Sequence, residues 1–367
     1  MLEMLLQGIS AVISDPISIV LIFLCTGIGI IFGAIPGLTA TIAIAMMLPM
    51  TFSMPTTMGI ASLVALYIGG ISGGLVSAIL LNMPGTPSSI ATCFDGRPLA
   101  LKGEGGKALG VGVVFSFIGT VLGIAAMIFI APPLASITIK FGAWEYFTVT
   151  MFSLTLIASL AGKNIVKGII TAVIGMMFAS VGLAPIDGVE RFTFGSVELT
   201  SGFAMLSVLV GLYAISEVMK TAGMMQSDEN FVATKFHMKG FGFSLQEFFS
   251  QIKNAIRSAI IGIGIGILPG IGGGTSNIVS YSIAKNQSRH PERFGTGIID
   301  GVVASETANN ATIGGAMIPL LTLGIPGDTA TAMLLGGFMI HGIQPGPLLF
   351  EAHGDIVYGV FTAMILS

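Results

Sequence analysis

The chain has 367 residues, of which 53% are hydrophobic and only 9% are charged. Soluble domains are about 25% charged, so this composition excludes an ordinary water-soluble protein and indicates a surface that faces lipid. The formal net charge of -3 excludes the basic face that a nucleic-acid-binding protein needs. Cys25 and Cys93 are the only cysteines and form neither a disulfide framework nor a zinc-binding pattern.

Long apolar segments predict many spanning helices, because a helix needs roughly 20 mostly apolar residues to cross a bilayer. Residues 1–14 carry a single charge, Glu3, and are typical of an interfacial helix rather than a signal peptide. The sequence therefore predicts an all-α polytopic membrane protein. The expected spans are 17–35, 57–81, 108–130, 147–161, 165–183, 203–219, 258–268, 271–284, 297–323, 330–343 and 356–367.

Basic residues gather in four loops, and basic loops mark the cytoplasmic side of a membrane protein. Two spans separate the first loop from the second, and two more separate the second from the third, so these loops can share one side. The four loops hold thirteen of the fifteen Lys and Arg residues and lie at 97–107, 163–167, 220–257 and 285–293.

The sequence also contains a weak internal repeat. The pattern Gly-x-x-x-Gly-x-x-Pro-Gly occurs at 29–37 and, 233 positions later, at 262–270. A glycine eleven residues before a Pro-Gly pair occurs at 73–85 and, 242 positions later, at 315–327. Repeats of this kind are typical of secondary transporters.

The loops that follow the second Pro-Gly pair predict the orientation of the two halves. Residues 95–107 are basic, whereas residues 344–355 contain no Lys or Arg, so we expect two inverted repeats. By the arithmetic of the repeat, a complete second half would extend roughly a hundred residues further, so it is expected to be C-terminally incomplete. The expected organisation is a first membrane repeat at 1–220, a cytoplasmic linker at 221–254 and a second, truncated membrane repeat at 255–367.

Each Pro-Gly pair interrupts an apolar segment and frees backbone N–H groups that lipid cannot satisfy. We expect these broken, re-entrant helices to meet near the bilayer midplane, where helix N-termini attract anions. The span cores lack Lys and Arg to neutralise a carboxylate, although Ser and Thr here also fit ordinary N-caps. The expected substrate-binding residues are Asn82, Gly85, Thr86, Ser88, Ser89, Gly273, Thr275, Ser276, Asn277, Gly327, Thr329 and Thr331.

Acidic residues inside apolar segments are costly and usually functional. Asp328 follows a helix break, and Glu306 lies with Asn310 in a long apolar stretch. These three residues and Thr39 are the expected ion-coupling residues, with Na⁺ near Asp328 as the expected metal ion. Either Na⁺ or H⁺ fits as the coupling ion, and no other cofactor is predicted. A polar contact between helices is the alternative role for Glu306.

Two other functions fit parts of the sequence. Residues 70–73, Gly-Ile-Ser-Gly, resemble the motif of intramembrane serine proteases, with Ser72 as nucleophile and His341 as a distant base. The repeat places Gly314 where Ser72 stands, so helix packing explains the motif better. The second alternative is a passive channel for small anions, which substrate uptake independent of ion gradients would favour.

Four segments resemble the TctA-type large membrane subunit of the tripartite tricarboxylate transporters. The resemblance implies ion-gradient-driven uptake of tricarboxylates or related organic carboxylates across the bacterial inner membrane. It also implies a small membrane partner subunit and a periplasmic substrate-binding protein, and carriers of this architecture are often homodimers. The segments are GAIPGLTATIAIAMMLP (33–49), LLNMPGTPSSIATCFDGRPLALKGEGGKALG (80–110), ILPGIGGGTSNIVSYSIAK (267–285) and LTLGIPGDTATAMLLGG (321–337).

Overall fold

The computed structural model divides the chain into two compact units, Met1–Lys140 with Ser227–Ser367 (unit 1) and Phe141–Gln226 (unit 2). In unit 2, helix α8 (Ile165–Ala179) precedes a short antiparallel pair, β1 (Gly182–Leu183) and β2 (Glu190–Arg191), and the helix η3 (Val197–Ser201). Most of the expected spans 147–161 and 203–219 lie outside the described residues. The structure describes residues 2–145, 147, 148, 151, 152, 164–184, 188–203, 208, 211, 212, 219 and 242–367.

The first half of unit 1 is a series of helices with clear local start signals. Asp15 caps α2 by accepting hydrogen bonds from the N–H groups of Ile17 and Ser18, and Pro16 fits the first turn. The helices of this half are α1 (Leu2–Ile13), α2 (Pro16–Ala34), α3 (Ala40–Thr51), α4 (Thr56–Leu81), η1 (Pro87–Ser89), α5 (Ile90–Leu99), η2 (Ala100–Glu104) and α6 (Gly105–Thr138).

The second half begins with a capping box, in which Ser244 and Glu247 bond each other's backbone N–H groups at the start of α11. Asp328 caps α14 in the same way with Thr331. The helices of this half are α11 (Leu245–Ile267), α12 (Gly272–Gln287), η5 (Pro291–Arg293), α13 (Ile299–Leu323), α14 (Thr329–Ile340), α15 (Leu349–Ala352) and α16 (Gly354–Leu366).

The four Pro-Gly pairs of the internal repeat lie between helices, as the sequence predicts. Gly37 and Gly270 follow α2 and α11 with φ of 92° and 79°, a region that favours glycine. Asn82 and Gly324 end α4 and α13 in the same left-handed region, with φ of 59° and 70°. Positions that match in the repeat therefore share a backbone conformation.

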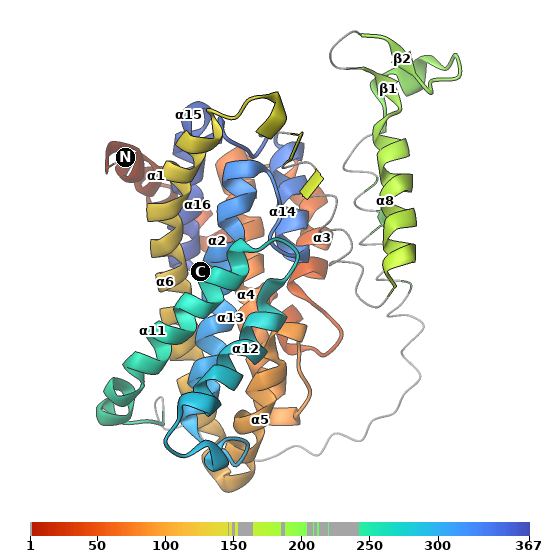
Figure 1. Ribbon diagram of the computed structural model, residues 1–367. Coiled ribbons are helices and arrows are strands. Elements are labelled where there is room, and N and C mark those ends of the chain that lie inside the picture. The colour runs from red at the N-terminus through yellow and green to blue at the C-terminus, as the bar shows by residue number, and fades with distance from the viewer. Residues whose placement is uncertain are drawn as a thin grey trace. The chain divides into compact units, whose positions relative to one another are not determined.

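Helix α13 is the central element of unit 1 and is in contact with α6, α11 and α12 (Figure 1). Every residue from Gly301 to Thr322 is buried, including the polar ones. Glycines allow this close packing, because a Cβ atom at Gly119 or Gly123 of α6 would collide with the α13 backbone. The polar side chains of α13 are consequently held inside the protein rather than in lipid.

The two halves of unit 1 are built around matching glycine contacts. Gly29 of α2 packs on the carbonyl of Leu66 in α4, and Gly262 of α11 packs on the carbonyl of Ala308 in α13. These partners are 233 and 242 positions apart, the offsets of the sequence repeat. Equivalent contacts join Gly33 to Gly70, Gly266 to Thr312, Gly73 to Ile30 and Gly315 to Ile263.

Helices α3 and α5 follow Pro-Gly breaks, where helix starts are expected, but they are shorter than a bilayer crossing and are not among the expected spans. Helix α11 also begins at Leu245, inside the range expected to be linker. The expected interfacial helix is α1, which packs on α16, where Gly8 contacts the backbone of Tyr358.

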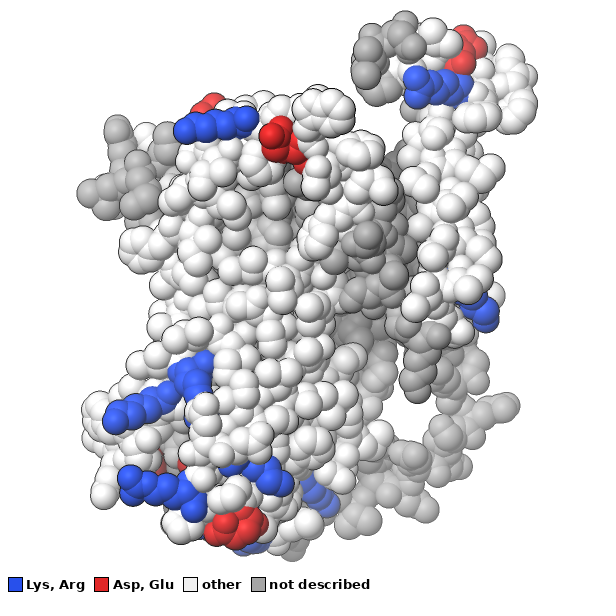
Figure 2. Space-filling view, in the orientation of Figure 1, with Lys and Arg blue, Asp and Glu red and all other residues white. Residues whose placement is uncertain are grey.

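Length and hydropathy identify the stretches of the described chain that can cross a membrane. They are Pro16–Ala34, Thr56–Leu81 and Pro87–Thr138, which together with the helical content establish an all-α membrane protein. On the face shown in Figure 2, most Lys and Arg residues of unit 1 gather at one end, and the surface between the two ends is almost free of charge. This distribution fits the basic loops noted in the sequence.

Candidate functional site

The starts of four helices lie close together in unit 1. The hydroxyls of Thr41 in α3 and Thr329 in α14 are 3.1 Å apart. A Cβ atom at Gly272, where α12 begins, would lie 3.2 Å from Asp328 Cβ. At Gly274 a Cβ would lie 3.2 Å from the carbonyl oxygen of Pro87 in η1. Backbone N–H groups at helix starts have no intrahelical partner. Thr39 and Asp328 cap the starts of α3 and α14, whereas the start of α12 has no side-chain cap.

These contacts are related by the sequence repeat. Thr41 and Gly274 are 233 positions apart, and Pro87 and Thr329 are 242 positions apart. The contact of Thr41 with Thr329 therefore corresponds to the contact of Gly274 with Pro87, with the two halves exchanged. Each half thus contributes its first broken helix to the second broken helix of the other half.

Asp328 is held on three sides at the start of α14. Its Oδ1 accepts hydrogen bonds from the Thr331 N–H at 2.7 Å and the Thr331 hydroxyl at 2.8 Å. Its Oδ2 accepts a 2.6 Å hydrogen bond from the hydroxyl of Tyr67 in α4. The carboxylate links the two halves through neutral donors.

Glu306 is fully buried in α13, with an exposed fraction of 0%. The hydroxyl of Thr92 in α5 donates to Oε1, and the hydroxyl of Ser116 in α6 donates to Oε2 at 3.0 Å. No Lys or Arg of the described chain forms an ion pair with it. Burying an unpaired carboxylate costs several kcal/mol (~3 or more), so a cation from solution would stabilise this site.

The Glu306 site continues through α13 to α4. Asn310 donates from Nδ2 to the Ser116 hydroxyl at 2.8 Å, and its Oδ1 accepts from the Ser72 hydroxyl at 2.7 Å. This geometry gives Ser72 an amide partner, which cannot serve as a general base. The arrangement of a protease nucleophile with His341 therefore has no support, and Ser72 belongs to a polar network.

Several of the expected substrate-binding residues join helices to each other. Asn277 accepts a 2.7 Å hydrogen bond from the Ala91 N–H at the start of α5. The Ser276 hydroxyl bonds Thr312, and the backbone of Gly327 accepts from the Gly270 N–H at 2.8 Å. These residues, like Gly85, which packs on the Gly33 carbonyl, position the helix starts.

The remaining expected residues divide by location. Ser88 and Gly273 lie at the convergence, where a Cβ at Gly273 would be 2.8 Å from Ser88 Oγ. Thr39 caps α3, and the Ser89 hydroxyl bonds the carbonyl of Thr86. Asn82 and Thr275 are exposed, and nothing in the structure brings their side chains to the other helix starts.

Sequence reasoning missed Tyr67, Thr92 and Ser116, the neutral partners of the two acidic residues. It had no signal for them, because hydroxyl residues are common in membrane helices and their partners are distant in sequence. It also missed Asp95, a fully buried carboxylate of α5. The sequence places that residue at the edge of the basic loop 95–107, where an acidic residue is ordinary.

Asp95 links the first half to the loop before α13. Its Oδ1 accepts from the N–H groups of Gly295, Gly297 and Ile298 at 3.0, 2.8 and 3.1 Å, and its Oδ2 accepts from the Tyr281 hydroxyl at 2.9 Å. Four donors satisfy the carboxylate without a cation, so Asp95 has a structural role and holds α5 against the loop before α13.

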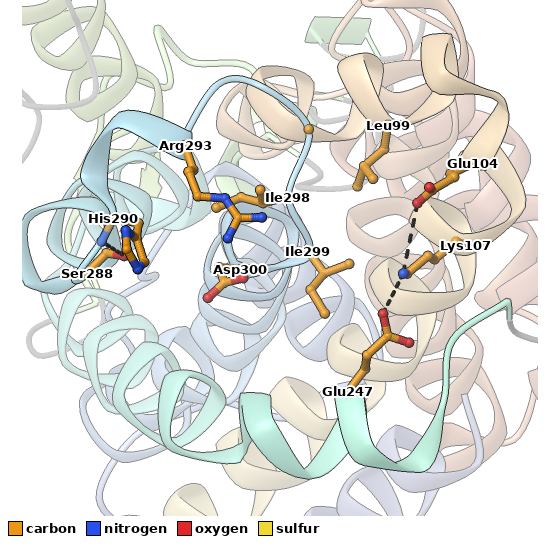
Figure 3. A pocket seen from close by; sticks show the side chains of 11 residues that line it. Leu99, Glu104, Lys107, Glu247, Ser288, His290, Arg293, Ile298, Ile299 and Asp300 are labelled. Atoms are coloured by element: carbon orange, nitrogen blue, oxygen red, sulfur yellow. Dashed lines mark hydrogen bonds and ion pairs between the residues drawn. The ribbon is translucent and has the colours of Figure 1, made fainter.

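A cavity of about 300 Å³ opens at the end of unit 1 where basic residues gather. Lys107 bonds Glu247 of α11 on one side, and Arg293 and Asp300 lie on the other (Figure 3). The Lys107 ammonium lowers the pKa of Glu247 below its ordinary value, chiefly through their hydrogen bond. This pair joins α6 to α11.

Broken apolar helices whose starts lie beside acidic residues are typical of membrane transport proteins. The chain belongs to the tripartite tricarboxylate transporter TctA family, which it matches over residues 19–367. This result confirms the resemblance seen in the sequence.

Two relatives from Agrobacterium vitis are similar to the chain. An uncharacterized 52.8 kDa protein in the TAR-I ttuC' 3'region is 37% identical over 349 residues, covering 95% of this chain and 69% of the relative. An uncharacterized protein in the TAR-II ttuC' 3'region is 42% identical over 100 residues, covering 27% of this chain and 41% of the relative. No solved structure matches the chain.

Proposed function

We propose that the chain is the substrate-translocating part of an ion-gradient-driven transporter for tricarboxylates or related organic carboxylates. The observation that carries this proposal is the convergence of four helix starts in a region without Lys or Arg among its described contacts. Free N–H groups and the positive ends of helix dipoles favour an anion there. A carboxylate substrate can thus bind without a basic side chain.

Glu306 supports coupling to an ion. Its carboxylate is buried among hydroxyl and amide groups and has no cationic partner among the described residues. Na⁺ prefers oxygen ligands of this kind, and a proton would neutralise the same group. Asp328 is the second acidic residue proposed for coupling, and it differs in its position, because it caps α14 through Thr331 and joins α4 through Tyr67.

The matching contacts of the two halves support two inverted repeats that meet near the bilayer midplane. The proposal includes a small membrane partner subunit and a periplasmic binding protein, as expected for a tripartite system, with the chain in the bacterial inner membrane. A homodimer and the boundaries at 220 and 254 remain predictions.

Uptake in membrane vesicles tests this function. Radiolabelled citrate and succinate are offered with the binding protein and partner subunit present, under an imposed Na⁺ gradient, an imposed H⁺ gradient, or neither. We expect accumulation with one of the two ions only. Accumulation that needs neither gradient would favour the passive channel and contradict the proposal.

Glu306→Gln sharpens the same experiment. Glutamine keeps the size of the side chain and removes its charge, so we expect gradient-driven accumulation to fall by about 100-fold. Exchange of internal for external citrate should persist in this variant. Thr322→Val is the control, because the Thr322 hydroxyl bonds only the Ile318 carbonyl of its own helix among described partners.

A further inference from the structure

Asn309 in α13 is a buried amide without a partner. Its exposed fraction is 1%, and neither Oδ1 nor Nδ2 has a hydrogen-bond partner among the described residues. The amide lies near the Glu306 carboxylate, one turn earlier, but forms no hydrogen bond of normal geometry with it. A buried unpaired amide costs about 1–3 kcal/mol, which a ligand would recover.

The repeat shows what is missing at Asn309. Tyr67 and Asn309 are 242 positions apart, and so are Thr86 and Asp328. In one pair the Tyr67 hydroxyl reaches Asp328 at 2.6 Å. In the corresponding pair the Thr86 hydroxyl, like the Asn309 amide, is buried and unpartnered among described residues. Asn309 and Thr86 thus occupy the positions of Tyr67 and Asp328 in the other half, but their side chains do not form a hydrogen bond with each other.

Asn309 lies beside the Ser88 hydroxyl and the start of helix α12. A Cβ atom at Gly273 would lie 2.7 Å from Asn309 Oδ1 and 2.8 Å from Ser88 Oγ, so Asn309 and Ser88 face the same point at the start of α12. Helix α12 has 16 residues, and its first N–H groups are free for a ligand. Glycine at position 273 allows the side chains of Asn309 and Ser88 to approach the start of α12 this closely.

We propose that Asn309, together with Ser88 and the first N–H groups of α12, binds one carboxylate group of the transported organic acid. This inference rests on the proposed function and names the residue that recognises the substrate. The free N–H groups and hydroxyls favour an anion over a cation at this point, because the N-terminal end of a helix is positive.

The position of Asn309 also connects the substrate to Glu306. Two carboxylates in a region of low dielectric repel each other, so the substrate binds only after a cation neutralises Glu306. Asn309 lies near both Glu306 and the start of α12, and its amide can present either the nitrogen or the oxygen to the substrate. With Glu306 neutralised, the nitrogen turns to the substrate and donates a hydrogen bond.

Three variants test the site in the complete transporter. Asn309→Ala removes one donor to a charged group, so the KM for citrate should rise by about tenfold to 100-fold with a smaller change in maximal rate. Asn309→Asp keeps the shape but adds a negative charge, so uptake should be weaker than in Asn309→Ala. Thr307→Val is the matched control, because the Thr307 hydroxyl is also buried and unpartnered in the described part of α13.

The outcomes separate the inference from the proposed function. If the unaltered protein accumulates neither citrate nor succinate, the proposed function fails and this inference fails with it. If it accumulates citrate but Asn309→Ala keeps the KM within twofold, Asn309 does not contact the substrate and the inference is wrong. A variant that changes the Na⁺ concentration for half-maximal uptake, but not the citrate KM, would make the site a cation site and also overturn it.

Discussion

Two matching pairs of residues lie between the halves of unit 1, Tyr67 with Asp328 and Asn309 with Thr86, but only the first pair forms a hydrogen bond. On one side a phenol reaches a carboxylate, and the Tyr67 hydroxyl donates to Asp328 at 2.6 Å. On the other side Asn309 and Thr86 are buried and do not meet. The backbone is similar, so the length of the side chains decides whether the bridge is closed by protein or left for a ligand. A repeated fold can in this way carry one fixed contact and one binding site.

Asp328→Asn changes the carboxylate of the Tyr67–Asp328 hydrogen bond and should have the largest effect on transport. Asparagine still caps α14, so we expect membrane insertion to be intact. Loss of the charge should abolish coupled uptake, a decrease of about 100-fold or more in vesicles. Accumulation at the unaltered rate would mean that the ion site does not include Asp328.

Tyr67→Phe tests the same bridge from the other side. It removes only the hydroxyl and leaves Asp328 Oδ2 without its donor. We expect a loss of about 1–3 kcal/mol of stability, seen as a lower melting temperature in detergent. Tyr358→Phe is a control of the same chemistry in α16. Equal melting temperatures for Tyr67→Phe and the unaltered protein would show that the bridge is not formed.

Asp95→Asn tests whether the hydrogen bonds between Asp95 and the loop before α13 affect stability but not substrate binding. The amide cannot accept from the Gly297 N–H and the Tyr281 hydroxyl as both carboxylate oxygens do. We expect a loss of about 1–3 kcal/mol by thermal unfolding. The KM for citrate should stay within about twofold, and a tenfold rise would place Asp95 in the binding site.

The Lys107–Glu247 pair should have the smallest effect, and it depends on pH. The folded-state pKa of Glu247 is below the ordinary value of 4.5, so the pair stabilises the fold above that pH and loses its contribution as the pH falls through the folded pKa. The carboxylate is 35% exposed, so the contribution is at most about 1 kcal/mol. The melting-temperature difference from Glu247→Gln should vanish in acid. A melting-temperature difference that persists in acid would show that Glu247 stabilises the protein by capping α11 and not by its ion pair with Lys107.

Much of this fold could be predicted because its signals are local. Pro-Gly pairs end helices whatever surrounds them, and charged loops mark one side of a membrane. The Gly-x-x-x-Gly repeat at 29–37 and 262–270 is typical of close helix contacts, and the structure makes such contacts at equivalent positions. Family membership could be inferred for the same reason, because the broken segments carry the resemblance.

The partners of the acidic residues could not be predicted from the sequence. Thr92 and Ser116 meet Glu306 across 214 and 190 residues, and only the packing of α13 brings them together. Short helices such as α3 also escape prediction, because a length criterion selects segments that cross the whole bilayer. Asn309 stands out only when its missing hydrogen bonds are seen.

The glycine contacts also determine which parts of unit 1 can move. Backbones that touch at glycine cannot slide without a clash, so α2 with α4 should form one rigid body and α6 with α11 and α13 another. These bodies are joined by the Ser72–Asn310 hydrogen bond and by apolar side chains around Leu75 and Val302, which can be broken and re-formed. We therefore expect alternating access to occur as a rocking motion along this boundary, with the substrate's entrance and exit opening in turn at its two ends.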